Sequence, residues 1–277
     1  MARVIHLAND TLDLDLDPAR GMLATSCRWR DEELFVPSRA RREEVPRVDT
    51  VRGMALLAPW ANRLPGDRYA VGDRVVDLST LPIERDPSGL PLHGTITGRG
   101  DWAVLEHRRD AIVAGIRLDE DPITAAAFPF AARIQVAWRL LPDALEVTTT
   151  LIASGDDAVP ACFGWHPYLL LPDADRGACT VRLPGVPAAP IGPGTIDGPV
   201  ALDAGRDAVL AGAGRELTVS LGPGYDALWA WMPAGEPFIS LEPMVGAPGA
   251  LARGPYPVAR PGAPYRATFR LGVRGTD

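Results

Sequence analysis

The sequence predicts an all-β fold, a large antiparallel β-sandwich with little helix. Apolar and polar residues alternate along many short stretches, the pattern of strands that bury one face. In addition, 28 glycines and 28 prolines are spread through 277 residues, and both residue types break long helices. Many closely spaced short strands favour a sandwich, and the chain has no repeat of fixed period that would favour a propeller or a solenoid.

The clearest pair of predicted strands lies in the middle of the chain. Residues 132–140 and 145–151 alternate between apolar and polar side chains, and the turn sequence at 141–144 between them predicts a hairpin. Further strands are expected toward the C-terminus, at residues 217–221, 227–232, 236–241 and 265–273.

Length and charge favour one domain without a nucleic-acid partner. Residues 1–277 contain no linker, and 47% of them are hydrophobic, enough for one large core, so we expect a single domain. The net charge of −7 argues against a nucleic-acid partner. The densest basic run is expected to be a solvated loop; it comprises Arg39, Arg41, Arg42 and Arg47, interrupted by Glu43 and Glu44.

Cysteine usage and hydropathy point to the cytoplasm. Cys27, Cys162 and Cys179 are odd in number and lack CxxC spacing, which fits a reducing compartment. The N-terminus lacks the apolar stretch of a signal peptide, and no apolar run is long enough to span a membrane, so no membrane partner is expected. A monomer and a homodimer both stay open.

The absence of lysine excludes several chemistries. All basic side chains other than histidine are arginine. A lysine Schiff base, covalent attachment of pyridoxal phosphate and a Walker phosphate loop are therefore excluded.

The four histidines are the first candidates for proton transfer, because imidazole titrates near neutral pH. His107 lies in a charged stretch and His6 in an expected N-terminal strand, so both are expected to be structural or exposed. His93 follows an apolar run and precedes a glycine, and His166 lies among aromatic residues before a proline. From the residues alone, His93 and His166 are each either a buried core or turn residue or a catalyst.

Glu242 is the carboxylate that stands out. It follows the apolar part of residues 238–244, where alternation places Phe238, Ser240 and Glu242 on one face. An acid at the end of an apolar strand is costly to bury unless it is paired or functional. The alternative is a salt-bridged strand end.

The segment at residues 59–69 is a loop bounded by proline and glycine that contains Asn62 and Arg63. Their side chains offer several hydrogen-bond donors to neutral hydroxyl groups. The alternative is a surface loop with an ion-paired arginine.

Taken together, four segments resemble the aldose 1-epimerase (galactose mutarotase) family. In chain order they are Trp60-Ala61-Asn62-Arg63, Leu92-His93-Gly94, His166-Pro167-Tyr168 and Glu242-Pro243-Met244. Each segment is weak alone, but four in this order are specific, and the similarity extends over nearly the whole chain. The resemblance implies the family's β-supersandwich, no cofactor, and a small-molecule sugar substrate whose α and β anomers are interconverted.

The resemblance also implies roles for the site residues. Glu242 would take the proton of the C1 hydroxyl, and His166 would protonate the ring oxygen, so that the ring opens and recloses on either face. His93 would stabilise charge on the oxygen at the reacting carbon. Sugar-binding roles are implied for Asn62 and Arg63, and stacking on the sugar for Trp60, Tyr168 or Trp165.

Members of the family carry a sugar-binding aspartate between the second histidine and the glutamate. The best local match is Asp207, with Asp203 as the competitor. Val209 and Leu210 lie where the family has an aromatic residue. The sugar therefore stays open among galactose, glucose and phosphorylated or modified hexoses.

Three other functions stay open. A glycoside hydrolase would pair Glu242 with a second carboxylate such as Asp226. A sugar-binding or sugar-sensing protein would use the same fold without catalysis. A metal enzyme would use His93, His166 and Glu242 as ligands, although the close His-x-His or His-x-Asp pair usual in such sites is missing.

Overall fold

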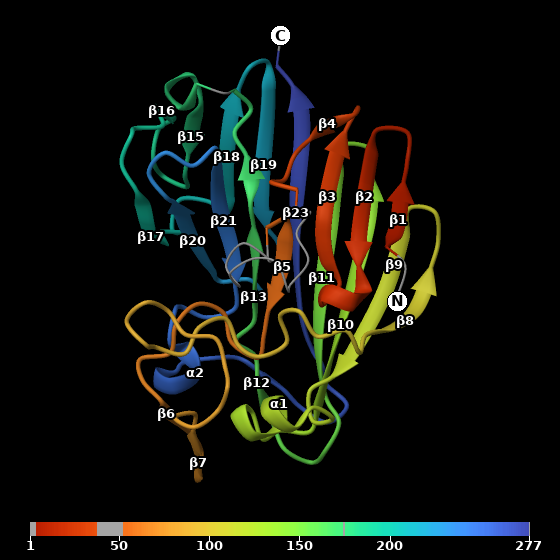
Figure 1. The fold of residues 1–277 in the computed structure, drawn as a ribbon, viewed down its shortest axis with the longest axis vertical. Coiled ribbons are helices and arrows are strands. Elements are labelled where there is room, and N and C mark those ends of the chain that lie inside the picture. Colours follow the sequence, from red (N-terminus) through yellow and green to blue (C-terminus); the bar gives the residue numbers. More distant parts are fainter. Residues whose placement is uncertain (1–3, 38–51, 174, 277) are drawn as a thin grey trace.

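Two large antiparallel sheets, one in front of the other in Figure 1, make up most of the molecule. The computed structural model describes residues 4–37, 52–173 and 175–276. The basic run of Arg39, Arg41, Arg42 and Arg47 lies outside the described residues. The predicted fold class, an antiparallel β-sandwich with little helix, is confirmed.

Among the described residues, the first sheet has ten strands, and it carries the site described below. Its main path has the order β1-β2-β3-β5-β13-β21-β20-β17, with β4 paired to β3 and β14 paired to β21. In chain order its strands are β1 (Ile5–Ala8), β2 (Leu12–Asp17), β3 (Leu23–Trp29), β4 (Glu32–Glu33), β5 (Met54–Leu57), β13 (Gly164–Pro167), β14 (Leu169–Leu170), β17 (Ile196–Val200), β20 (Ala227–Met232) and β21 (Phe238–Met244).

In the part of the chain that the structure describes, the second sheet has nine strands, in the order β16-β15-β18-β19-β23-β11-β10-β9-β8. In chain order they are β8 (Ala103–His107), β9 (Ala111–Arg117), β10 (Ala132–Leu141), β11 (Ala144–Ala153), β15 (Thr180–Arg182), β16 (Ala189–Pro190), β18 (Asp207–Gly212), β19 (Arg215–Leu221) and β23 (Tyr265–Gly275). The predicted hairpin is formed by β10 and β11, which pair from Ala132 and Ala153 to the turn at Leu141 and Ala144.

Smaller elements lie at the lower end of the sandwich in Figure 1. They are the pair β6 (Arg68–Val71) and β7 (Arg74–Asp77), the pair β12 (Val159–Pro160) and β22 (Val258–Ala259), and the helices α1 (Pro122–Ala127) and α2 (Ala250–Arg253). Short 3₁₀ turns occupy Pro18–Arg20 and Arg176–Ala178. Within the described ranges, no helix has the length and apolar character needed to cross a membrane.

The core lies between the two sheets, as period-two alternation requires. Trp165 of β13 packs edge-on against Trp138 of β10, with ring centroids 4.9 Å apart. Because successive strand residues point to opposite faces, His166 faces away from the second sheet. The three cysteines are buried and free.

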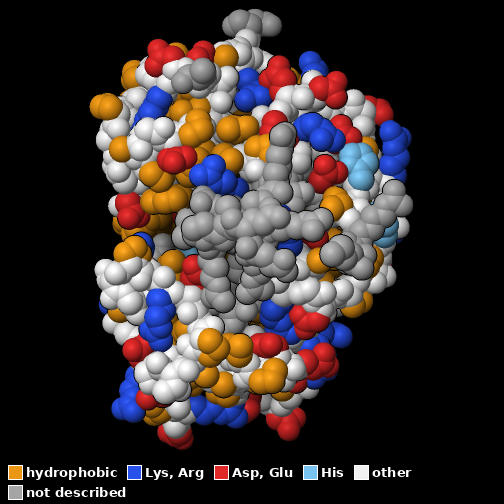
Figure 2. All heavy atoms as spheres, in the orientation of Figure 1, with side chains coloured by type: hydrophobic (Ala, Val, Ile, Leu, Met, Phe, Trp, Pro, Cys, Tyr) orange, Lys and Arg blue, Asp and Glu red, His pale blue; other side chains and the backbone are white. Residues whose placement is uncertain are grey.

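The two histidines expected to be structural or exposed lie on the surface. His107 is an exposed residue of β8. His6 of β1 contacts two carboxylates, with Nε2 3.1 Å from Asp13 and Nδ1 2.8 Å from Asp15. Figure 2 shows basic and acidic side chains interspersed over the described part of one face of the molecule.

Candidate active site

Neighbouring strands of the ten-stranded sheet set the main site residues side by side. Gly164 of β13 pairs with Met244 of β21 in an antiparallel arrangement. Two residues farther along this register, His166 therefore lies opposite Glu242. On the other side of β21, Trp229 of β20 lies opposite Glu242, and Trp231 lies opposite Ser240. Alternation puts all these side chains on the face directed away from the second sheet.

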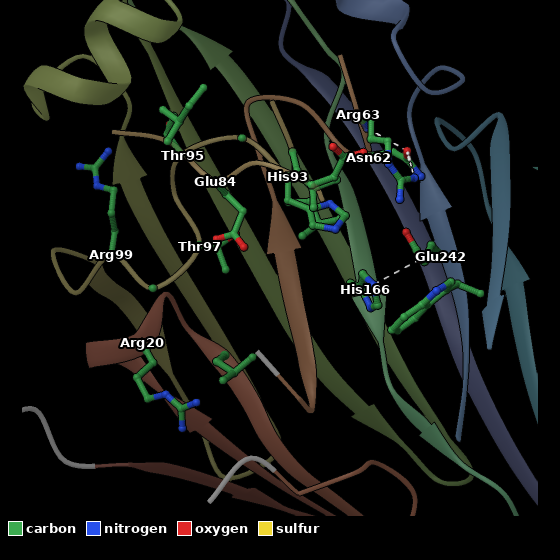
Figure 3. Close-up of a pocket in the computed structure, with 18 of the residues that line it drawn as sticks. Arg20, Asn62, Arg63, Glu84, His93, Thr95, Thr97, Arg99, His166 and Glu242 are labelled. Carbon is green, nitrogen blue, oxygen red and sulfur yellow. Dashed lines mark hydrogen bonds and ion pairs between the residues drawn. The ribbon is translucent and has the colours of Figure 1, made fainter. Parts of the chain in front are cut away.

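A cavity of about 630 Å³ opens over this face. The sheet supplies one wall, and loop residues between 82 and 99, which include His93, supply much of the other. In Figure 3, Asn62, Arg63 and His93 lie on one side of the His166–Glu242 pair, with Arg20 and Arg99 farther along the cavity.

His166 and Glu242 form a buried pair in this cavity. Nε2 of His166 lies 3.4 Å from Oε1 of Glu242, and the two residues are 6% and 2% exposed. The second carboxyl oxygen, Oε2, is buried without a hydrogen-bond partner among the described residues. Such an oxygen is costly to bury, so it marks a place where a ligand hydroxyl would restore a hydrogen bond. The structure also corrects the expected position of Glu242, which lies inside β21 and not at the end of a strand.

The imidazole of His166 is fixed on several sides. Its ring stacks on Tyr168 at 4.6 Å and meets the rings of His93 and Trp231 edge-on, each at 5.5 Å. Nδ1 lies 3.0 Å from the hydroxyl oxygen of Ser240. The ring therefore presents Nε2 to Glu242 in a defined orientation.

Burial shifts both members of the pair toward their neutral forms. Loss of hydration raises the pKa of Glu242 to about 8, with Asp197 raising it further and Arg63 opposing the shift. Loss of hydration lowers the pKa of His166 to about 3. Near neutral pH these shifts favour a protonated Glu242 beside a neutral His166.

Arg63 is held from two sides beside the pair. Nε of Arg63 donates to Oδ2 of Asp86 at 2.7 Å, and Nη1 lies 3.4 Å from Oδ1 of Asn62. Asp86 also accepts from the backbone N–H groups of Ser88 and Leu90, and these donors together with Arg63 leave its pKa lowered despite desolvation. The alternative of an ion-paired arginine is thus correct for the pairing, but Arg63 also lines the cavity.

Two residues of the site have left-handed backbones. Asn62 has φ 56° and His93 has φ 59°, conformations that cost residues other than glycine of order 1–3 kcal/mol. The His93 N–H donates to the Asn62 carbonyl at 3.0 Å, which ties the two loops together. Nδ1 of His93 is buried without a described partner, and burial holds the pKa of His93 well below its usual range. His93 is therefore a neutral ring with an unused polar atom beside the pair.

Six predicted site residues line the cavity together: Asn62, Arg63, His93, His166, Tyr168 and Glu242. Two of the three predicted stacking residues do not line it. Trp60 is buried in the core, and Trp165 packs between the sheets with its indole N–H donating to Thr149 at 3.0 Å. Neither side chain is therefore placed to stack on a ligand in this cavity.

The expectation that Asp207, or its competitor Asp203, lies at the site is also not met. Asp207 begins β18 in the second sheet, opposite Ser220, and is exposed; Asp203 is exposed in the loop before it. Asp197 of β17, which lies between His166 and Glu242 in the sequence, does line the cavity. Its Oδ1 accepts the indole N–H of Trp229 at 2.8 Å. The sequence analysis overlooked Asp197 because β17 contains a glycine and a proline and lacks a clear strand pattern. The local match near residue 207 was therefore preferred.

Sequence reasoning also missed the aromatic side of the cavity. Trp229 and Trp231 alternate along β20 with the buried residues Leu228 and Ala230, and both tryptophans line the cavity. The bounds of β20 were predicted correctly. The sequence did contain a signal for this side of the cavity. Two tryptophans share one face of a predicted strand that directly precedes the strand of Glu242.

The structure also bears on two competing functions. Asp226, the carboxylate suggested as a hydrolase partner, accepts the N–H of Gly246 at 2.6 Å and does not line the cavity. Across the described part of the chain, no three His, Cys, Asp or Glu side chains are grouped as metal ligands. The particular carboxylate pair and the metal triad therefore lack geometric support.

Comparisons with known proteins agree with the sequence resemblance. The sequence profile of the family described as aldose 1-epimerase matches residues 36–185. The uncharacterized protein YphB of Escherichia coli (strain K12) is 26% identical over 173 residues, which cover 62% of this chain. The aligned residues span about half of YphB, 54% of its length.

Solved structures of similar fold cover the whole chain. The Slr1438 protein from Synechocystis sp. PCC 6803 matches with a TM-score of 0.82 at 20% identity, covering 100% of this chain and 97% of that one. A putative aldose 1-epimerase from Escherichia coli K12 matches with a TM-score of 0.78 at 20% identity, covering 99% of both chains. Galactose 1-epimerase from Lactobacillus acidophilus NCFM matches with a TM-score of 0.69 at 12% identity, covering 99% of this chain and 95% of that one.

At these identities the structural matches show the shared fold, the galactose mutarotase-like β-sandwich. The sequence profile carries the family assignment, because it covers more than half of the chain. The chain belongs to the aldose 1-epimerase family.

Proposed function

We propose that this chain is an aldose 1-epimerase that interconverts the α and β anomers of a hexose. The observation that carries the proposal is the buried His166–Glu242 pair, whose nitrogen and oxygen lie 3.4 Å apart in a cavity large enough for a sugar. The reaction moves one proton off the C1 hydroxyl and one proton onto the ring oxygen, so it needs one acid and one base.

The pair supplies these two roles with a single proton. Glu242 as a carboxylate accepts the C1 hydroxyl proton, while His166 as an imidazolium protonates the ring oxygen and the C1–O5 bond breaks. Rotation about C1–C2 and closure on the other face reverse both transfers, so no net proton is gained or lost. Burial favours the proton on Glu242, and Nε2 of His166, 3.4 Å from Oε1, would receive it when the sugar binds.

The surrounding residues would bind and orient the sugar. The unpartnered Nδ1 of His93 would hydrogen-bond the oxygen at the reacting carbon. Arg63, Asn62 and Asp197 would bind other hydroxyls and fix the ring. Tyr168, Trp229 and Trp231 would provide the apolar surface against a sugar face.

The charges of the cavity favour a neutral hexose over a hexose phosphate. Among the described residues that line it, five carboxyl groups accompany three arginines. Of these arginines, Arg63 donates to Asp86 and Arg99 is paired with Asp101. A phosphate dianion in this cavity would have to compete with the carboxylates that already bind these guanidinium groups.

The test is to measure anomer exchange by NMR or polarimetry on a panel of freshly dissolved sugars. The panel contains α-galactose, α-glucose and their 6-phosphates, with Glu242→Gln and His166→Asn alongside. We expect the wild type to accelerate a neutral sugar, and each variant to lose about 10²–10⁴-fold in kcat/KM because an acid or base is removed. If the wild type accelerates none of these sugars, the proposed activity is refuted; full activity of Glu242→Gln would remove Glu242 from the mechanism.

A further inference from the structure

The mechanism gives no role to Ser240, although Ser240 touches the proposed acid. Its side chain is fully buried in the middle of β21, and its hydroxyl oxygen lies 3.0 Å from Nδ1 of His166. We propose that Ser240 is a positioning residue that holds His166 with Nδ1 protonated and Nε2 directed to the sugar. The inference rests on the proposed function for its catalytic consequence, but not for the state of the ring.

The aromatic neighbours of His166 do not fix which ring nitrogen faces Glu242. Stacking on Tyr168 and edge contacts from His93 and Trp231 define the plane of the imidazole. A half-turn about the Cβ–Cγ bond keeps this plane, but it exchanges each nitrogen with a carbon. The hydrogen bond to Ser240 distinguishes the two orientations, because the flipped ring would place a carbon against the hydroxyl.

The tautomer follows from the carboxyl group at the other ring nitrogen, because a hydroxyl can donate or accept and therefore fits either form. With the proton of the pair on Glu242, Nε2 carries the lone pair that faces the carboxyl group 3.4 Å away. Nδ1 then carries the hydrogen and donates it to Ser240. When Nε2 takes a proton, Nδ1 keeps its own, so this hydrogen bond persists through both halves of the reaction.

A hydroxyl suits this position because it is uncharged. A carboxylate on Nδ1 would stabilise the imidazolium and make His166 a weaker acid toward the ring oxygen. Serine accepts the same hydrogen bond without adding a negative charge beside Glu242. His166 is thereby oriented while it stays ready to release its proton.

The kinetic test compares Ser240→Ala with Ser240→Thr, which keeps a hydroxyl. We expect Ser240→Ala to lower kcat by about 10–100-fold with KM changed less than about threefold, because the acid is misoriented while the sugar contacts remain. Ser240→Thr should recover most of kcat. Ser26→Ala is the matched control. It removes a strand hydroxyl that does not line the cavity and that donates to Glu33 at 2.5 Å.

Three kinetic results would overturn the proposal. They are a kcat for Ser240→Ala within twofold of the wild type, an equal loss in Ser26→Ala, and no recovery in Ser240→Thr at an unchanged melting temperature.

The second readout needs neither sugar nor activity. Long-range ¹H–¹⁵N NMR at pH 7, with His166 assigned by its loss in His166→Asn, reports which ring nitrogen bears hydrogen. We expect a protonated Nδ1 and a bare Nε2 in the wild type, and a mixture of tautomers in Ser240→Ala. A wild-type hydrogen on Nε2 alone, or an unchanged spectrum in Ser240→Ala, would contradict the proposal. If Ser240→Ala does not fold, the wild-type spectrum decides. If the expected tautomer is observed but the protein has no epimerase activity, the proposed function is refuted and the orientation of His166 by Ser240 is not.

Discussion

The proton shared by His166 and Glu242 is the main consequence of burial at the residue scale. Removing the carboxyl group and the imidazole from water favours the neutral form of each, which raises the pKa of Glu242 to about 8 and lowers that of His166 to about 3. Between these values the pair holds one proton. The proposed ring opening and closure require that single proton.

The pH dependence of kcat/KM follows from this arrangement. We expect kcat/KM to be nearly flat from about pH 5 to 7 and to fall up to tenfold per pH unit above about 8, because the pair then loses its proton. His93, Arg63 and Asp197 also face the pair, and burial keeps the pKa of His93 well below its usual range. Initial rates corrected for buffer catalysis provide the measurement. A fall on acidification through pH 6.5 would show instead that His166 titrates near its ordinary pKa.

At this scale the sequence pointed to the proposed reacting residues more directly than to the proposed binding residues. Four motifs in order identified His166 and Glu242, because residue type and spacing are visible in one dimension. Asp197 and Ser240 were not identified, since each depends on which strands lie side by side. Asp207 matched a local pattern, but its strand belongs to the other sheet.

At the scale of elements, strand register places the chemistry. The pairing of β13 with β21 sets His166 opposite Glu242, and β20 adds Trp229 opposite the same glutamate. Alternation predicted β10 and β11 well because buried residues recur at every second position through β10 and the first half of β11. Adjacency of β13 and β21, which are far apart in the chain, carries no comparable local signal.

The loop that carries His93 depends on Gly94. Gly94 has φ 71°, and a Cβ atom built there would lie 2.0 Å from the Ala58 carbonyl oxygen. We expect Gly94→Ala to lower the stability by about 2 kcal/mol or more beyond any backbone strain, because the clash is with backbone that cannot move aside. Thermal unfolding followed by circular dichroism provides the measurement.

Gly262→Ala is the matched control for Gly94→Ala. Gly262 has φ 75° but nothing within 4 Å of an added Cβ, so Gly262→Ala should show the backbone strain alone, about 1 kcal/mol. Equal losses in the two variants would show that the close approach at Ala58 does not matter.

At the scale of the whole molecule, the two sheets share one core beneath the site. Trp165, adjacent to His166 in β13, packs against Trp138 of the second sheet. Tyr225 and Phe269 add a further aromatic contact in the same core, at 5.7 Å. The sequence predicted a sandwich and one domain, but it did not predict the order of strands, which depends on contacts between distant segments.

A shared core predicts that the sheets unfold together. We expect one calorimetric transition whose van't Hoff and calorimetric enthalpies agree, because neither sheet can keep its inner face buried alone. Trp165→Ala should lower the stability by about 3–5 kcal/mol and shift the whole transition. Two separate transitions, with Trp165→Ala affecting one of them, would instead divide the chain into two domains.

The central proposal is that the His166–Glu242 pair opens a sugar ring. NMR exchange between α and β anomers of galactose and glucose measures this at equilibrium, without a coupling enzyme. We expect faster exchange of at least one neutral hexose with catalytic amounts of the wild type, and a loss of about 10²–10⁴-fold in Glu242→Gln. Binding of the same sugars with no faster exchange would contradict the proposal and show a sugar-binding protein on this fold.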